Sequence, residues 1–440
     1  MTCHRFASAL LASLCAAVML PAPIAAESAA LDAEVLAASV EAPVVTWRRD
    51  IHQHPELGNR EHRTAALVAD HLRALGLDDV RTGIAHTGVT AVLKGGRPGP
   101  RLALRADMDA LPVTERSGLP FASTVTTQFR GETVGVMHAC GHDAHTAILM
   151  GVAQALASVR AQLPGEVLFI FQPAEEGPPE GEDGGARMML DEGIFERFHP
   201  DAVMGLHVFS TLRAGELGYR AGPIMAASDR FRILVKGRQT HGSRPWGGVD
   251  PIVAAADIIG SAQHIVSRQM DLSRQPVVLS FGAIKGGIRY NIIPDEVELI
   301  GTIRTFDEGM RQEVFTRLKD VAANVAAAHG ATVEAEVPDQ DGNPVTANDP
   351  ALSARMRPSL EAVAGAGNVI AMPLNMGAED FSQYALRVPG FLFFVGATPA
   401  DRDPRTAPSN HSPEFFLDEQ ALTLGTRAML RLSLDFLHAP

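Results

Sequence analysis

The order of its apolar segments constrains this chain more than any other feature. Outside a central block, short apolar runs such as GVTAVLKG, RLALRADMD and EVLFIFQ alternate with helix-like segments such as AHTAILMGVAQALASV. Strands alternating with helices predict an α/β domain with a mixed, largely parallel sheet and flanking helices. Ligands gather beyond the carboxyl ends of such strands. Because Asp107–Asp109, Glu175–Glu176 and His207 fall at predicted strand ends, we expect them to meet at one site.

The central block follows a different order. It reads as strand SDRFRILVKG, helix DPIVAAADIIGSAQHIVSR, two strands joined by a glycine turn, helix MRQEVFTRLKDVAANVAAAHG and strand ATVEAEV. This β-α-β-β-α-β order is ferredoxin-like. We therefore predict that residues 227–338 form an inserted α+β domain, and that residues 27–226 and 339–440 together form the catalytic domain.

The first 26 residues are typical of an export signal. Arg5 supplies a basic start, and an apolar run followed by small residues places cleavage near Ala26. No later stretch reaches the roughly 18 uninterrupted apolar residues of a spanning helix. Leu14 before Cys15 fits a lipoprotein site poorly. We expect an exported protein, periplasmic or secreted, without a membrane span.

Net charge and cysteine content narrow the function further. The formal net charge of −13 opposes nucleic acid binding, which needs a basic surface. Cys3 and Cys15 would leave with the signal, so Cys140 would be the one thiol of the mature chain, and no internal disulfide could form. A lone thiol in an exported protein must be buried or occupied, and a metal ion would occupy it.

The stretch MHACGHDAHTAILMG, residues 137–151, carries the first metal signal. Cys140 and His142 would diverge on a helix, but in a loop before a helix they can converge on one ion. A thiolate and an imidazole suit zinc, cobalt, nickel or manganese. A buried cysteine beside a helix-capping Asp143 would give the same pattern, so both interpretations stay open.

The stretch QPAEEG places Glu175 and Glu176 side by side. One carboxylate could bind a metal and the other could take a proton from water, a division of labour that suits metal-assisted hydrolysis. By itself, the acidic run EEGPPEGED fits a solvated loop equally. His207 in an apolar strand is typical of a core histidine, and His411 in a loop is uninformative alone.

Together these motifs resemble the dinuclear metallopeptidase clan of aminoacylases, carboxypeptidases, hippurate hydrolases and plant auxin-conjugate (IAA-amino acid) amidohydrolases, and most of all the last two groups. HACGHD followed by PAEEG and a late HS block is the specific combination. The resemblance runs almost from end to end, with the motifs in the family's order: RRDIHQHPELGNRE, LRADMDALPV, MHACGHDAHTA, QPAEEG, GLHV, DPI, NIIPDEVELIGTIRTF, MGAEDFSQY and HSPEFFLDE.

The resemblance implies two divalent ions per subunit, zinc, manganese, nickel or cobalt. The residues that match the family's metal ligands are Cys140, His142, Glu176, His207 and His411. Glu175 matches the catalytic base, and Asp109 matches an aspartate that orients a metal-binding histidine.

Two further matches lie in the inserted domain. His241 matches a histidine that reaches toward the substrate carbonyl, in dimers often from the partner, and Asn291 matches another position near the substrate. The chain departs from the family after His241, where Pro245-Trp246 replaces the usual Pro-His. The resemblance also implies that the inserted domain is a lid that carries a dimer contact, so we expect a homodimer or a higher homo-oligomer.

The expected activity is metal-dependent hydrolysis of the amide bond of N-acyl amino acids. An exported metallo-carboxypeptidase or dipeptidase is the nearest alternative, because it also breaks an amide beside a free carboxylate. A non-catalytic periplasmic binding protein is a third, although it would not need Glu175. The chain contains no HExxH motif and no GxSxG motif serving a serine triad, which removes two other hydrolase classes.

Overall fold

The computed structural model describes residues 1–2, 31–340 and 342–438. The predicted export signal, with Cys3 and Cys15, lies outside the described residues apart from its first two positions. Within the described part of the chain, no helix combines the length and the apolar character that crossing a membrane requires.

A mixed eight-stranded sheet forms the larger part of the structure. Four neighbouring pairs are parallel, β6 with β3, β3 with β7, β7 with β18 and β8 with β17, and the other three pairs are antiparallel. In spatial order its strands are β1 (Asp78–Ile84), β2 (Gly88–Lys94), β6 (Pro164–Gln172), β3 (Arg97–Asp107), β7 (Ala202–Arg213), β18 (Gly390–Thr398), β8 (Leu217–Tyr219) and β17 (Val369–Ala371). The predicted α/β class is confirmed.

Helices cover both faces of this sheet, which explains the uninterrupted apolar runs. Strand β18, GFLFFVGAT, is buried along its whole length, as expected for a central strand with helices on both sides. One face contacts α4 (His142–Ser158) and α11 (Gln420–His438), and α2 (Glu41–Gln53) packs on α4. A hydrophobic cluster with α5 (Gly185–Asp191), α6 (Ile194–Phe198) and α10 (Phe381–Ala385) covers the other. The remaining helices of this part are α1 (Ala33–Ala38), α3 (His62–Ala74) and α9 (Pro350–Ala364).

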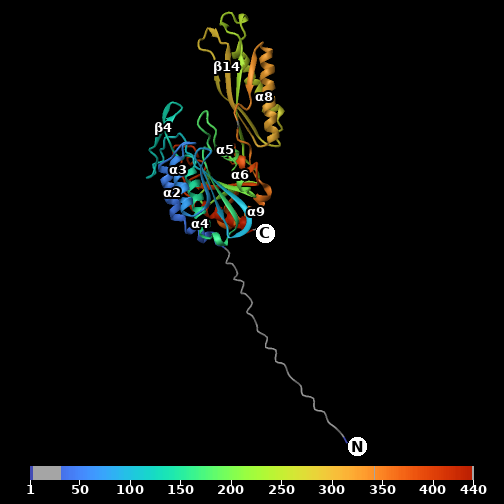
Figure 1. Cartoon of the computed structure of the whole chain (residues 1–440). Coiled ribbons are helices and arrows are strands. Elements are labelled where there is room, and N and C mark those ends of the chain that lie inside the picture. Colours follow the sequence, from blue (N-terminus) through green and yellow to red (C-terminus); the bar gives the residue numbers. More distant parts are fainter. Residues whose placement is uncertain (3–30, 341, 439–440) are drawn as a thin grey trace. The chain divides into compact units, whose positions relative to one another are not determined.

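A separate four-stranded antiparallel sheet is formed by the central block. Its spatial order is β12 (Val277–Lys285), β14 (Glu296–Thr305), β10 (Ala227–Lys236) and β15 (Thr332–Glu336), the ferredoxin-like arrangement. Helices α7 (Pro251–His264) and α8 (Glu308–Ala328) pack on one face, and α8 is visible beside β14 in Figure 1. Residues such as Phe231, Ile258 and Leu318 form the hydrophobic core between sheet and helices.

The remaining strands of the described residues form three two-stranded ribbons. They are β4 (Thr126–Phe129) with β5 (Glu132–Gly135), β9 (Gly222–Met225) with β16 (Thr346–Asn348), and β11 (Thr240–His241) with β13 (Ile292–Ile293). The hairpin β4–β5 was not predicted. It turns at Arg130 and Gly131, which both have left-handed φ angles, of 50° and 83°, as a tight hairpin turn requires.

The expected meeting of polar side chains at one sheet edge is observed, with one correction. Asp107 ends β3, and Glu175 and Glu176 follow β6 closely. His207, however, lies within β7 rather than at its end. The ladder between β3 and β7 stops at the pair Arg105 and Gly205, so His207 lies just beyond the point where the two strands part.

Candidate metal centre

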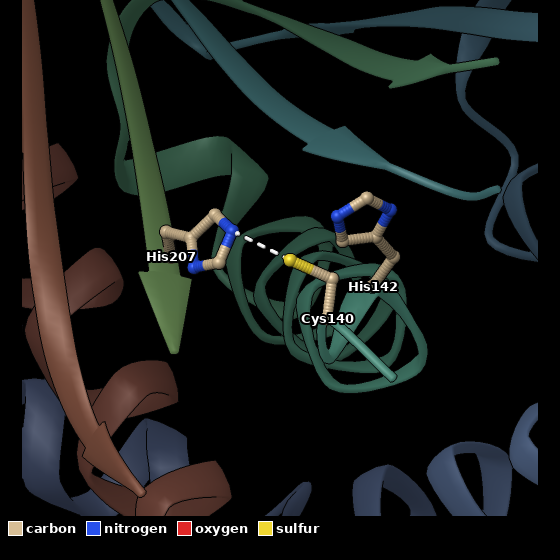
Figure 2. Close-up of side chains that lie close together, drawn as sticks. All are labelled: Cys140, His142 and His207. Carbon is tan, nitrogen blue, oxygen red and sulfur yellow. Dashed lines mark hydrogen bonds between the residues drawn. The ribbon is translucent and has the colours of Figure 1, made fainter. Parts of the chain in front are cut away.

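Cys140 and His142 flank the start of helix α4. His142 is the first helical residue rather than a loop residue, and Gly141 between them adopts a left-handed φ of 97°. A Cβ atom on Gly141 would lie 2.2 Å from a methyl carbon of Val208, so only glycine fits there. This tight turn presents the Cys140 thiol to β7, where its Sγ atom lies 3.4 Å from Nε2 of His207 (Figure 2).

The same thiol also faces a second group of donors. Nε2 of His411 lies 3.2 Å from Sγ of Cys140 and 2.8 Å from Oε1 of Glu176. Two sets of three donors, Cys140 with His142 and His207, and Cys140 with Glu176 and His411, each hold their donor atoms within 4.8 Å of one another. The structure thus brings together all five predicted ligands, with the thiol shared between the two sets.

The hydrogen bonds behind the two buried histidines suit metal binding. Nδ1 of His142 lies 3.1 Å from Oδ1 of Asp109, and its Nε2 has no hydrogen-bond partner among the described residues. Nδ1 of His207 donates to the carbonyl oxygen of Val208 at 2.7 Å, so its Nε2 faces the thiol without a proton. An outer hydrogen bond that fixes the tautomer and leaves the other nitrogen free is typical of metal-ligating histidines. The donor set therefore fits the divalent ions implied by the resemblance.

The charges around the site also favour the binding of cations. Burial opposes protonation of His142, but the carboxylates of Asp107, Asp109 and Glu176 raise its pKa to about 10. Burial raises the pKa of the Cys140 thiol well above its ordinary value, and Glu176, Glu175 and Asp107 add to that effect. Thus this buried set of acids favours any positive charge in the site. Divalent cations would supply it and would ionise the thiol as well.

Glu175 lies beside the candidate ligands without belonging to either set of three around Cys140. One of its oxygens lies within 4.8 Å of donor atoms of His142 and Glu176, and Oε1 accepts the backbone amide of Asp380 at 3.4 Å. Burial raises the pKa of Glu175 well above its usual range, and the charges of Glu379, Glu176 and Asp380 raise it further. A carboxylate with a raised pKa holds a proton more readily, as a general base must.

His241 and Asn291 lie on the ribbon β11–β13, where the backbone amide of Gly242 donates to the carbonyl oxygen of Asn291 at 2.9 Å. The amide of Ser243 donates to Nδ1 of His241 at 3.0 Å, so a neutral His241 carries its proton on Nε2 and can donate from there. Its side chain is exposed, and no described contact joins it to the five candidate ligands. Trp246 in the following turn is 76% exposed.

Asp143 does not act as a helix cap. Its carboxylate accepts hydrogen bonds from Nε of Arg48 and from Nδ1 of His52, each at 2.8 Å. The N-cap position of α4 is Gly141, without a side-chain hydrogen bond. The alternative interpretation of this stretch was a buried cysteine beside a helix-capping aspartate. Cys140 is buried, but Asp143 does not cap the helix, so the capping part of that interpretation is wrong.

Several buried polar residues beside the site had no role in the sequence-based interpretation. Nδ1 of His145 lies 2.6 Å from Oδ1 of Asp107. Arg105 is buried and bonds Asp107, Glu379 and Asp380. His145 follows His142 by three positions on the same helix, a spacing that could have suggested a shared face. No local signal links Arg105 to residues 379 and 380, because the contact spans more than 270 positions.

Comparison with known proteins identifies the family to which this chain belongs. Residues 103–435 match the model of "Peptidase family M20/M25/M40". Thermostable carboxypeptidase 2 of Saccharolobus solfataricus is 39% identical over 90% of this chain and 96% of its own length. N-acetylcysteine deacetylase of Bacillus subtilis is 38% identical over 89% and 96%. The crystal structure of Bacillus subtilis YXEP protein, described as a dinuclear metal binding peptidase, covers 92% of this chain and 100% of that one, with a TM-score of 0.74 and 34% identity. This chain is therefore a member of the peptidase family M20/M25/M40.

Proposed function

We propose that this protein hydrolyses the amide bond of N-acyl amino acids in a metal-dependent reaction, releasing a carboxylic acid and an amino acid. One observation carries the proposal. Four other candidate ligands, His142, Glu176, His207 and His411, lie around the Cys140 thiol, and the carboxylate of Glu175, whose side chain is 7% exposed, lies beside them without contacting the thiol. A protein that only binds would need the first feature but not the second. The relatives named above, a deacetylase and a carboxypeptidase, support hydrolysis of an amide.

The chain's own residues have separable tasks in this reaction. Divalent ions in such a site lower the pKa of water and polarise the amide carbonyl. Glu175 accepts a proton from the attacking water and delivers it to the leaving nitrogen of the amino acid. Asp109 holds His142 at Nδ1, so that its Nε2 points into the site. His241, with its proton on Nε2, would donate to the oxygen on which negative charge develops.

The finer features of the proposal rest on the sequence and the family. We propose residues 27–226 and 339–440 as the catalytic domain and residues 227–338 as a lid that carries a contact between two copies of the chain. The predicted signal of residues 1–26 supports export to the periplasm or the medium. Zinc, manganese, nickel and cobalt all suit the thiolate, imidazole and carboxylate donors, and the supply in the cell selects among them.

A carboxypeptidase or dipeptidase is the second candidate, favoured by the 39% identity to a protein named as a carboxypeptidase. The test uses purified protein, stripped with a chelator and reloaded with each metal in turn. Release of amino acid is measured from N-acetyl, N-benzoyl and N-indoleacetyl amino acids, and from dipeptides. We expect metal-dependent turnover that is faster on the acylated amino acids. Faster turnover of dipeptides would favour the peptidase, and tight metal binding without any hydrolysis would contradict both enzymes.

A further inference from the structure

The loop that carries Glu175 is held at two alternate backbone amides by two buried carboxylates. The amide of Ala174 donates to Oε1 of Glu61 at 2.9 Å. The amide of Glu176 donates to Oδ2 of Asp109 at 3.0 Å. Glu175 lies between the two anchored positions, so its Cα is fixed from both sides. Asp109 has a family role, whereas nothing in the sequence assigned one to Glu61.

Ala174 needs such an anchor because its backbone is strained. Its φ angle is 49°, in the left-handed region that residues with a Cβ rarely adopt. The residue is 2% exposed, so water cannot replace a lost partner for its amide. The neighbouring segment leaves little room for relaxation, since a Cβ on Gly58 would lie 3.1 Å from the Cα of Ala174. A strained residue persists only where its surroundings determine its conformation, and strain of this kind clusters at functional sites.

The side chain of Glu61 contacts the loop that carries Glu175 and does not cap its own helix. It occupies the N-cap position of α3, yet its side chain accepts no hydrogen bond from the first amides of that helix. Its carboxyl group is fully buried, and Oε2 accepts the hydroxyl of Thr87 at 2.5 Å. Burial and the charge of Asp109 raise the pKa of Glu61 to about 8. A proton on Oε2 would still leave Oε1 free to accept from Ala174.

We propose that Glu61 is a positioning residue for the general base: its Oε1 atom holds Ala174 in the left-handed turn from which Glu175 reaches the metal centre. This inference rests on the proposed function, in which Glu175 is the base. The acceptor oxygen matters here and not the negative charge. Glutamine at position 61 should therefore preserve the arrangement, and leucine of similar size should abolish it.

The test compares Glu61→Leu and Glu61→Gln with the unaltered protein in two measurements. The first is the hydrogen–deuterium exchange rate of the Ala174 amide, measured in metal-free protein. The second is kcat and KM, measured together with metal content after reloading. For Glu61→Leu we expect exchange at Ala174 to rise at least about tenfold. Its kcat should fall by about ten- to a hundredfold, with KM and metal content nearly unchanged, because misplacing a base impairs chemistry more than binding. Glu61→Gln should keep the exchange rate at Ala174 and kcat close to those of the unaltered protein.

A control removes a partly buried hydrogen bond elsewhere. Ser359 donates to Oδ2 of Asp435 at 2.6 Å, between α9 and α11, which carry no candidate ligand. Ser359→Ala should lower the melting temperature without changing exchange at Ala174 or kcat. If Glu61→Leu fails to fold, Thr87→Val replaces it. This change removes the partner of Oε2 alone and should produce smaller shifts in the same direction.

Three outcomes would overturn the proposal. Unchanged exchange at Ala174 in Glu61→Leu would show that Glu61 does not hold the loop. Raised exchange with unchanged kcat would show that the loop does not position the base. If Glu61→Gln and Glu61→Leu raised exchange at Ala174 and lowered kcat equally, the effect would come from the negative charge of Glu61 and not from its acceptor oxygen. A protein without any hydrolytic activity would contradict the proposed function separately, since the exchange measurement does not depend on turnover.

Discussion

Nε2 of His145 accepts the backbone amide of Val208 at 2.8 Å. That hydrogen bond fixes the tautomer of His145, because a nitrogen that accepts cannot carry the proton. Nδ1 must then donate to Oδ1 of Asp107, at 2.6 Å. The imidazole thus joins the end of β3 to the β7 residue directly after His207. A buried histidine outside the ligand set therefore holds the backbone that carries a ligand.

His145→Leu should consequently weaken metal binding. The change leaves the Val208 amide and the Asp107 carboxylate without their partner, so His207 loses its fixed position. We expect metal affinity to fall about 10- to 100-fold, as for other partners behind metal ligands. Competition with a chelating dye measures the affinity, and circular dichroism checks that the variant is folded. A folded variant with unchanged affinity would remove His145 from this role.

Changing Glu175 or its neighbour Glu176 to glutamine should impair the protein in two different ways. Glu175→Gln should keep its metal and lose turnover by about a hundredfold or more, because the reaction loses its base. Glu176→Gln should lose metal affinity, since the carboxylate beside His411 is a candidate ligand. Metal analysis by mass spectrometry, alongside turnover, separates the two. Near-normal turnover in metal-loaded Glu175→Gln would show that the base is another residue.

His241→Ala should reduce turnover while metal content stays intact, because the side chain belongs to the ribbon β11–β13 and not to the ligand set. If His241 acts across a dimer, mixing inactive His241→Ala with inactive Glu175→Gln should restore activity. Random exchange would give about a quarter of the unaltered activity, since half of the dimers carry one unimpaired site out of two. Subunit exchange is verified with differently tagged chains. Exchange without recovery would place His241 in its own subunit's site.

Arg105 should be essential for stability. Its guanidinium is fully buried and bonds the carboxylates of Asp107, Glu379 and Asp380 at 2.7–3.0 Å. Arg105→Met would remove the guanidinium that these buried acids share, and breaking a buried ion pair from one side typically costs about 3–5 kcal/mol. Arg357→Met, which breaks an exposed pair with Glu361, is the control and should cost about 0–1 kcal/mol. Urea denaturation measures both, and equal losses would contradict the prediction.

Glu61 should make the stability of the metal-free protein depend on pH. Its folded pKa of about 8 exceeds the ordinary value of 4.5, so the folded state keeps a proton that the unfolded chain has released. The free energy of unfolding should therefore fall as the pH rises from 4.5 to 8, by at most about 1.4 kcal/mol per pH unit. Glu61→Gln should remove this contribution. Urea denaturation with chelator at pH 5, 6, 7 and 8 tests it, and parallel pH profiles for both proteins would contradict it.

The sequence determined the fold class and the family because both depend on local patterns. Uninterrupted runs such as EVLFIFQ indicate strands covered on both faces, and the alternating strand of residues 227–236 indicates a sheet covered on one. The motif HACGHD also indicated that Cys140 and His142 can converge on one ion, although it left open the alternative of a buried cysteine beside a helix-capping Asp143. The five candidate ligands and Glu175 could be named because each stands in a short motif, although their roles remain predictions.

Only the tertiary structure decided how these motifs are held. Cys140 lies between His207 and His411, which are 67 and 271 positions away in the chain. Glu61 reaches Ala174 across 113 positions, and Arg105 reaches Asp380 across 275. No local propensity encodes such pairs, because they form only when the sheet brings strand ends and loops together and buried polar groups must find partners within the protein. The candidate residues of the site could therefore be named from the sequence, whereas the hydrogen bonds that hold them in position could not.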